Sequence, residues 1–237
     1  MRDELEGATT TDGVPGRLIR TTVRLLAEKG PSAIKARTIA SATGLSTMSL
    51  YSHFGGLPEL TLAVRDHGFR ELDKAFAGVP VTDDAIADLA GLALTCRGIA
   101  RGNPHLYDLM FGLSTRATYR PQNEPVGPLG SQSQAFRGAY ARVEEACIRA
   151  MSSGRITEQE TQVVAAQLWG FVHGFVTLEM AEIFAECDDP VGRLLLPIGV
   201  NLFVGLGDTR ERAHASHETA ARRYDSTSRD RDGGATQ

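Results

Sequence analysis

The residues of this chain whose types and spacing could do chemistry lie between Lys35 and Phe54, in the run KARTIASATGLSTMSLYSHF. Its second half carries hydroxyl, thioether and imidazole side chains and no acidic residue. Hydroxyl groups can bond base edges, and methyl-bearing groups can contact thymine methyls in a major groove. Donors near the end of such a helix can contact phosphates and fix its register. The segment therefore predicts a DNA-reading helix with these contact residues: Ser46, Thr47, Met48, Ser49, Tyr51, Ser52 and His53.

Two short helices joined by a tight turn are needed to present that face, and the spacing of Ala40, Gly44 and Leu50 predicts them. Ala40 is small enough to let the second helix approach closely, and Gly44 supplies a left-handed turn residue without a Cβ clash. Leu50 would fill the small core beneath the crossing. We expect these helices at about 35–42 and 46–53. Any helix–glycine–helix corner shares this spacing, so other features must decide whether it binds DNA.

Charge is distributed unevenly along the 237 residues. The formal net charge is −4, which taken alone argues against nucleic acid as a partner. Residues 14–54, however, hold six basic side chains and one acidic side chain, while residues 1–13 and 55–207 are acidic overall. A compact basic block at the front of an acidic protein favours DNA binding by this segment.

The same segment resembles the helix-turn-helix of TetR-type transcriptional regulators, over about residues 17–62. That family's typical order is IA…AGVS…LYxHF…E.L. Five stretches match it in order: Ile39-Ala40, Thr43-Gly44-Leu45-Ser46, Leu50-Tyr51, His53-Phe54 and Glu59-Leu60. The resemblance implies a homodimer on double-stranded DNA, with contacts from Arg37 and Thr38 in addition to those of the second helix.

Three positions depart from the family pattern. Lys35 stands where a threonine is usual, and Thr47 and Leu57 stand where lysines are usual. Either Lys35 and Arg37 replace the two missing phosphate-binding lysines, or the affinity and its salt dependence are lower than is typical of the family. We expect a shallower salt dependence and count Lys35 among the DNA-contacting residues.

Helical periodicity continues through the rest of the chain, and no run alternates as a strand requires. We therefore predict an all-α protein, with further helices at about 58–77, 83–101, 104–112, 132–153, 157–186 and 190–206 and a long loop over 118–134. Both ends hold few apolar residues and are predicted to be disordered. The predicted parts are a disordered tail 1–13, a helix-turn-helix domain 14–60, a ligand-binding and dimerisation domain 61–207 and a disordered tail 208–237.

Residues 157–186 carry two apolar stripes on different faces, where a surface helix of a monomer needs one. The next segment, 190–206, is apolar nearly all round. Two such helices favour a four-helix bundle between two copies, as the TetR resemblance also implies, although a larger monomeric core would give the same pattern. Candidate interface residues are Val164, Leu168, Phe171, Phe175, Leu195, Ile198, Leu202 and Phe203.

Aromatic and methionine side chains gather on the helices expected to surround an effector pocket. Trp169, Gly170, His173 and Gly174 also resemble the Trp–His–Gly signature of one subclass of TetR C-terminal domains. Such a lining favours a hydrophobic or aromatic small molecule over a sugar phosphate, although the same side chains could simply form a core. Candidate lining residues are His105, Tyr107, Met110, Phe111, Phe136, Tyr140, Trp169, His173 and Met180.

Other kinds of chemistry find little support in the sequence. It has no G-x-S-x-G, no H-E-x-x-H and no glycine-rich phosphate loop. Six histidines and three cysteines are dispersed, so we expect no catalytic site, no metal site and no cofactor. No apolar run reaches the ~20 residues of a membrane span, and the N-terminus lacks the apolar core of a secretory signal, which favours a cytoplasmic protein.

Together these observations predict a ligand-responsive transcriptional regulator, most simply a repressor, that binds a near-palindromic operator as a homodimer. A small hydrophobic or aromatic effector would release it from DNA. The alternative is an all-α enzyme or a helical interaction protein without specific DNA binding.

Overall fold

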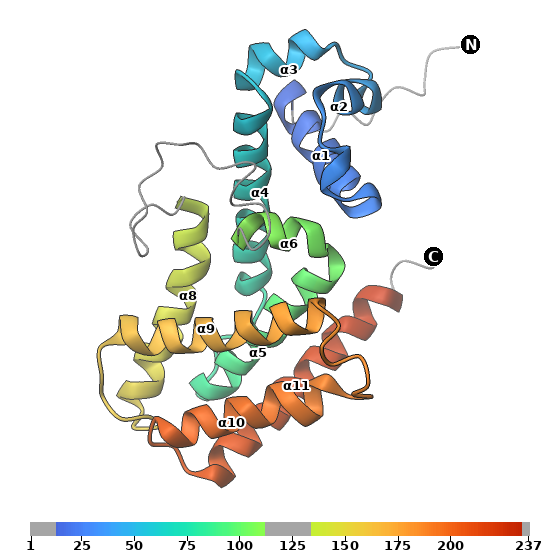
Figure 1. Ribbon diagram of the computed structural model, residues 1–237. Coiled ribbons are helices and arrows are strands. Elements are labelled where there is room, and N and C mark those ends of the chain that lie inside the picture. The colour runs from blue at the N-terminus through green and yellow to red at the C-terminus, as the bar shows by residue number, and fades with distance from the viewer. Residues whose placement is uncertain (1–12, 112–133, 234–237) are drawn as a thin grey trace, which may run out of the picture. The chain divides into compact units, whose positions relative to one another are not determined.

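The computed structural model describes residues 13–111 and 134–233, which form helices and their connections and contain no strand (Figure 1). The predicted all-α class is confirmed for these residues. All but the last residue of the predicted tail 1–13, and all but the last residue of the predicted loop 118–134, lie outside the described residues. Two compact units divide the chain: Met1–Phe69 with Asn103–Ser131, and Arg70–Gly102 with Gln132–Gln237.

The first unit is a small helical domain around a core of fully buried leucine and isoleucine side chains, among them Leu18, Ile39 and Leu50. Its elements are α1 (Val14–Lys29), a 3₁₀ turn (Pro31–Ala33), α2 (Ala36–Thr43), α3 (Thr47–Phe54), the first part of α4 (Leu57–Ala77) and α6 (Pro104–Phe111).

This unit is larger than the predicted domain 14–60, because α4 stays with it as far as Phe69 and α6 joins it from later in the chain. Packing explains the difference. The side chains of Met110 and Leu106 on α6 lie against Gly68 of α4, where a Cβ would collide with Met110. Asn103 precedes the first residue of α6, and its Oδ1 accepts a hydrogen bond from the Leu106 amide at 3.0 Å.

The second unit is a helical bundle in which α5 contacts α8, α9 and α11. Its elements are the end of α4, α5 (Ala85–Gly102), α8 (Gln134–Ser152), α9 (Thr161–Met180), a π-helical turn (Val191–Leu195), α10 (Leu196–Gly205) and α11 (Arg210–Gly233). Buried alanines along α5, including Ala85, Ala87 and Ala90, let its neighbours approach closely. The three cysteines, Cys96, Cys147 and Cys187, are free.

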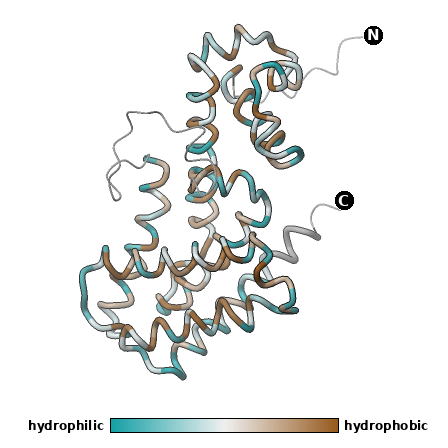
Figure 2. The backbone as a smooth tube through the Cα atoms, viewed as in Figure 1, coloured by the Kyte–Doolittle hydropathy of each residue, from teal (hydrophilic) through white to brown (hydrophobic). Residues whose placement is uncertain are grey.

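Hydrophobic residues run along α9 and α10 (Figure 2). Among the described helices, α9 is the one long and apolar enough to cross a membrane by composition. Five of its residues are buried in the bundle, so core packing accounts for much of its apolar character. A π-helical turn ends just before Pro197, where the Leu196 amide donates a hydrogen bond to the Val191 carbonyl.

The disorder predicted for 208–237 is wrong over Arg210–Gly233, which form α11. The helix is poor in large apolar residues, but its small side chains allow close contact with α5. Ala213 and Ala220 are buried, and the hydroxyl of Tyr224 lies so close to Gly98 of α5 that no Cβ would fit there. The start of the helix is further held by a buried ion cluster made of Asp84, Arg155, Asp208 and Ser216.

Candidate DNA-reading surface and effector cavity

Helix α3 has defined ends. Ser46 is extended, and its hydroxyl oxygen accepts a hydrogen bond from the Ser49 amide at 3.2 Å, which is an N-cap. Gly44 in the preceding turn has φ 66°, and Gly55 after the helix has φ 82°. Side chains with a Cβ would be strained at such positive φ values. Two glycines and one serine therefore fix where this eight-residue helix begins and ends.

One face of α3 is buried against the core of the first unit. Leu50 and Ile39 are fully buried and Ala40 nearly so, which confirms the predicted packing of the helix-turn-helix. Thr43 adds hydrogen bonds from its hydroxyl to the Ile39 carbonyl at 2.8 Å and the Ala40 carbonyl at 3.0 Å. The position of α3 on α2 is thus set by packing as well as by the turn.

The opposite face of α3 lies at the surface. Met48 is 70% exposed and Tyr51 is 49% exposed. Adjacent large apolar side chains at this exposure are typical of a binding surface. The structure buries none of the ten predicted DNA-contact residues: Lys35, Arg37, Thr38, Ser46, Thr47, Met48, Ser49, Tyr51, Ser52 and His53 are all exposed or half-buried.

Two of these ten residues use their hydroxyl groups within the helix itself. Ser46 caps its start, and Ser52 donates to the Ser49 carbonyl at 3.1 Å. Thr47 and Met48 are therefore the better candidates for contacts with bases. Lys35 and Arg37 are exposed at the start of α2, where their positive charges suit phosphate contacts.

Four predicted ligand residues lie on α6, inside the first unit. The Tyr107 ring is buried and packs against Phe111 with centroids 4.7 Å apart, and Phe111 meets Phe69 edge-on at 5.5 Å. Met110 covers Gly68, and His105 lies against Gly30 at the end of α1. These residues fasten α6 to the helices that carry α3, and none of them lines the cavity of the second unit.

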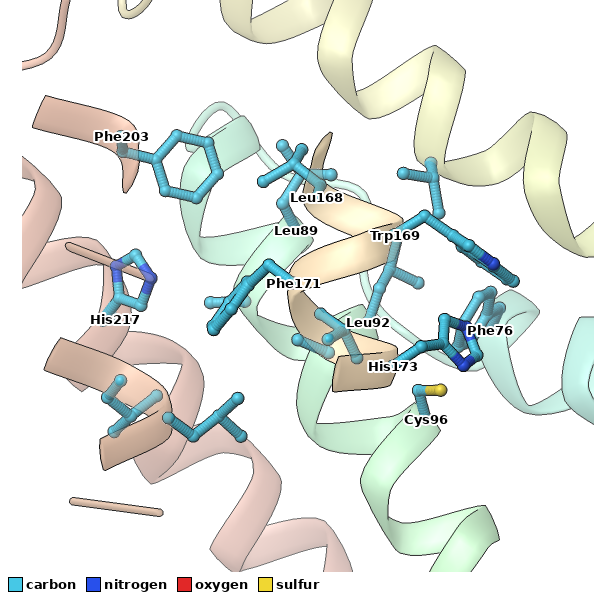
Figure 3. A pocket seen from close by; sticks show the side chains of 16 residues that line it. Phe76, Leu89, Leu92, Cys96, Leu168, Trp169, Phe171, His173, Phe203 and His217 are labelled. Atoms are coloured by element: carbon cyan, nitrogen blue, oxygen red, sulfur yellow. The ribbon is translucent and has the colours of Figure 1, made fainter. Parts of the chain in front are cut away.

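That cavity is bounded by residues of α4, α5, α8, α9, α10 and α11 (Figure 3). It has about 580 Å³ of atom-free space, its open mouth included. Phe203 and His217 lie at one side of it, Trp169 and His173 lie at the other, and Phe171 lies between them. None of its 16 lining residues is Asp, Glu, Lys or Arg. An apolar lining with a few polar atoms is typical of a small-molecule site.

Two of the nine predicted ligand residues, Trp169 and His173, line this cavity. Phe136 and Tyr140 of α8 lie behind Trp169, which both rings meet edge-on at centroid distances of 5.6 and 5.2 Å. The Tyr140 hydroxyl is buried and has no hydrogen-bond partner within the described part of the chain, and burial raises the pKa of this tyrosine. Met180, the last residue of α9, lies outside the lining.

The predicted interface residues divide by burial. Phe171 and Leu202 are half-buried, and Ile198 is 43% exposed. The other five are packed within the chain's own bundle and have no surface left for a partner: Val164, Leu168, Phe175, Leu195 and Phe203. The stripe that holds the candidate interface residues Val164, Leu168 and Phe175 thus largely packs into this chain's own core.

The outward face of α9 is instead built largely from small residues. We call it the α9 face and define it by Val163, Ala166, Gly170, Gly174 and Leu178, all of them exposed. A Cβ added at Gly170 or Gly174 would meet nothing within 4 Å. Neither glycine is therefore required by packing inside this chain.

Sequence reasoning missed His217, which reaches the cavity wall from α11. Residues 208–237 were predicted to be disordered because they hold few large apolar residues. The sequence did contain a signal for a helix here. Small side chains and one aromatic ring recur every three or four residues, which places them on a single helical face: Ala213, Ser216, Ala220 and Tyr224. No group of three or more possible metal ligands occurs within residues 13–111 and 134–227.

Two family matches cover most of the chain. Residues 18–64 match bacterial regulatory proteins of the tetR family, and residues 89–195 match the tetracyclin repressor-like C-terminal domain. An uncharacterised HTH-type transcriptional regulator of Mycobacterium tuberculosis is 26% identical over 175 residues, which make up 72% of each chain.

Solved structures share the fold. A protein of unknown function from Rhodococcus sp. RHA1 is similar with a TM-score of 0.67 and 21% identity, over 86% of this chain and 100% of that one. RolR in complex with the ligand resorcinol is similar with a TM-score of 0.61 and 17% identity, over 88% of this chain and 93% of that one. At these sequence identities the similarity shows a shared fold. The resemblance to the Trp–His–Gly subclass stays a prediction.

Proposed function

Because the chain belongs to the TetR family of transcriptional regulators, we propose that it is a repressor that binds a near-palindromic operator as a homodimer and is released by a small hydrophobic or aromatic effector. The observation that carries the DNA-binding part is α3, a capped helix whose inner face is buried and whose outer face exposes Met48 and Tyr51. A helix held in this way can enter a major groove without losing its support.

The roles of the DNA-contacting residues follow from their positions. Thr47 and Met48 read bases from the start of α3, while Tyr51 and His53 contact phosphates farther along. Lys35 and Arg37 neutralise phosphates beside α2. A two-fold dimer would place its two α3 helices roughly 34 Å apart, in successive major grooves of one side of the operator.

A homodimer is supported by the α9 face. Small residues at Ala166, Gly170 and Gly174 would let two α9 helices approach closely, and Val163 and Leu178 would add apolar contact at the two ends. Ile198 of α10, 43% exposed, offers further apolar surface. An exposed apolar surface of this kind is typical of a protein–protein contact, here with a second copy of the chain.

The effector is assigned to the cavity of the second unit, whose lining carries no charged side chain. Its apolar and aromatic walls suit a molecule of low polarity. RolR, similar in fold, was solved with resorcinol, a small aromatic molecule, which agrees with this class of ligand.

Release would occur by a shift in population between two dimer geometries, one of which spaces the α3 helices wrongly for the operator. Two covalent connections are available to carry the effect. Helix α4 runs without interruption from Leu57 in the first unit to Ala77 in the second. Asn103 alone joins α5 to α6, and its side-chain amide also donates to the Val23 carbonyl of α1 at 3.4 Å.

The test begins with selection of genomic fragments by the purified full chain, followed by footprinting. We expect a two-fold symmetric site with half-sites about one helical turn apart. Replacing Lys35 and Arg37 together by alanine should weaken binding to all sequences, and Met48→Ala should change the base preference. Arg222→Ala, which removes one exposed charge from α11, serves as the control and should leave binding unchanged. Recovery of no symmetric, salt-sensitive site would contradict the proposal.

A further inference from the structure

The end of the cavity formed by α11 carries one side chain with a defined hydrogen-bonding role. His217 is 4% exposed, and its ring faces Phe203 with centroids 5.6 Å apart. In Figure 3 the imidazole lies at the edge of the cavity, with Phe171 as its neighbour across the open space. This histidine belongs to the segment that composition alone marked as a disordered tail.

The protonation pattern of His217 follows from its contacts. Its Nδ1 lies 2.7 Å from the Ala213 carbonyl oxygen, which can only accept, so Nδ1 carries the hydrogen. Burial, opposed by that hydrogen bond and by Asp84 and Asp208, lowers the pKa of His217, so the imidazole is neutral near pH 7. A neutral imidazole with hydrogen on Nδ1 has a lone pair on Nε2. Nε2 is therefore a hydrogen-bond acceptor.

The position of this acceptor is fixed from two sides. Ser216, the preceding residue, takes part in the buried ion cluster with Asp84 and Arg155, which holds the start of α11 against α5. Gly199 of α10 leaves the room that the ring occupies, because a Cβ there would collide with Nε2. No residue in the described part of the chain forms a hydrogen bond with Nε2.

We propose that the cavity binds an uncharged, largely apolar molecule carrying a hydroxyl group, and that this hydroxyl donates its hydrogen bond to Nε2 of His217. The inference rests on the proposed function for the location of the effector site and adds its recognition chemistry. A carboxylate or phosphate would find no cation among the lining residues and would meet the Nε2 lone pair with negative charge. A hydroxyl group can donate a hydrogen bond to Nε2, which accepts none from the described residues.

The probes are three molecules that share a propylphenyl group: 4-propylphenol, its methyl ether 4-propylanisole, and 4-propylbenzoate. Binding to the full chain is measured by calorimetry, and occupancy of the cavity is followed by fluorescence of Trp169, the single tryptophan. We expect the phenol to bind about tenfold more tightly than the ether, equivalent to about 1.4 kcal/mol. The benzoate should bind more weakly than both.

Variants assign the preference to one atom. His217→Leu should bind phenol and ether equally, while His214→Gln, on the exposed side of the same helix, should keep the tenfold ratio. Equal binding of phenol and ether by the unaltered chain overturns the inference, whatever the folding of the variants. So does a preference that survives His217→Leu and disappears in His173→Leu, or a failure of every probe to change Trp169 fluorescence.

The two proposals can fail separately. A phenol that shows the expected preference and leaves operator affinity unchanged supports recognition by His217 and contradicts release by that ligand. A different compound that releases the protein from DNA, together with equal binding of phenol and ether, supports the repressor and contradicts the recognition by His217.

Discussion

Arg155 and Asp208 form a buried ion pair that ties the α8–α9 connection to the start of α11. Nη2 of Arg155 lies 2.6 Å from Oδ2 of Asp208, and Nε lies 3.1 Å from Oδ1. The side chains are 9% and 0% exposed. Hydrogen bonds to Asp208 and the charge of that carboxylate raise the pKa of Arg155, so the guanidinium stays ionised in this site. A pair of this geometry is stable only while both partners are present.

Removing one partner of that pair should therefore be costly. We expect Arg155→Met to lower the free energy of unfolding by about 3–5 kcal/mol, because it leaves the Asp208 carboxylate buried without its main counter-charge. Urea unfolding followed by circular dichroism measures the loss. Arg212→Ala removes a 54% exposed arginine 3.9 Å from the same carboxylate and should cost less than about 1 kcal/mol. Equal losses for both variants would contradict the assignment.

Acid should destabilise the second unit through His173. Burial lowers its pKa from 6.5 to about 3, so the unfolded chain binds the proton more readily than the folded one. The contribution of His173 to stability is complete above pH 6.5 and is lost as the pH falls toward 3. Between pH 6.5 and 5 we expect a loss of up to about 2 kcal/mol from this group.

Urea unfolding at several pH values measures that effect. His173→Leu should flatten the dependence over this range while leaving the contribution of His217 in place. A slope unchanged by the substitution would show that other groups take up the protons.

The missing lysine of α3 can be restored. We expect Thr47→Lys to strengthen DNA binding and to steepen the dependence of log K on log salt by about 2 for a dimer, one phosphate contact being added per chain. Thr47→Gln lengthens the side chain without charge and should leave the slope unchanged. An electrophoretic mobility shift assay at several salt concentrations measures the slope for each variant. A wild-type slope already implying many phosphate contacts would contradict the shallow dependence expected here.

Dimerisation can be separated from folding at Gly170. A leucine there has open space within its own chain, yet it would hold two α9 helices apart. Sedimentation equilibrium of Gly170→Leu should give a weaker dimer with unchanged helicity, whereas Gly170→Ala should remain a dimer and gain helix stability of up to about 1 kcal/mol. A dimer of wild-type strength in the leucine variant would place the interface elsewhere.

Local patterns predicted the DNA-reading part well because its signals are short-range. Ala40, Gly44 and Leu50 act within a few residues of one another, and the structure gives each the role expected from its size or its φ value. Most helices before residue 207 were likewise available from periodicity, whereas α11 was not. The π-helical turn before Pro197 agrees with the missing amide hydrogen of proline, which interrupts a regular helix.

The cavity could not be predicted in the same way, because its composition depends on contacts between distant segments. Periodicity showed that α9 has apolar stripes but gave no means of telling which stripe α5 would cover. Tyr107 and Trp169 looked alike as aromatic candidates, and tertiary packing assigned them to different units. His217 was missed because alanine-rich helices bury little apolar area and rely on close approach and ion pairs, neither of which appears in composition.

Because α11 forms one wall of the cavity and is the last helix of the chain, the cavity is completed only at the end of synthesis. Helices α5, α9 and α10 leave the ribosome before α11, so the nascent chain holds an unfinished cavity until His217 emerges. The helix-turn-helix has by then long been synthesised. A newborn chain would thus complete its helix-turn-helix earlier than the cavity of the second unit.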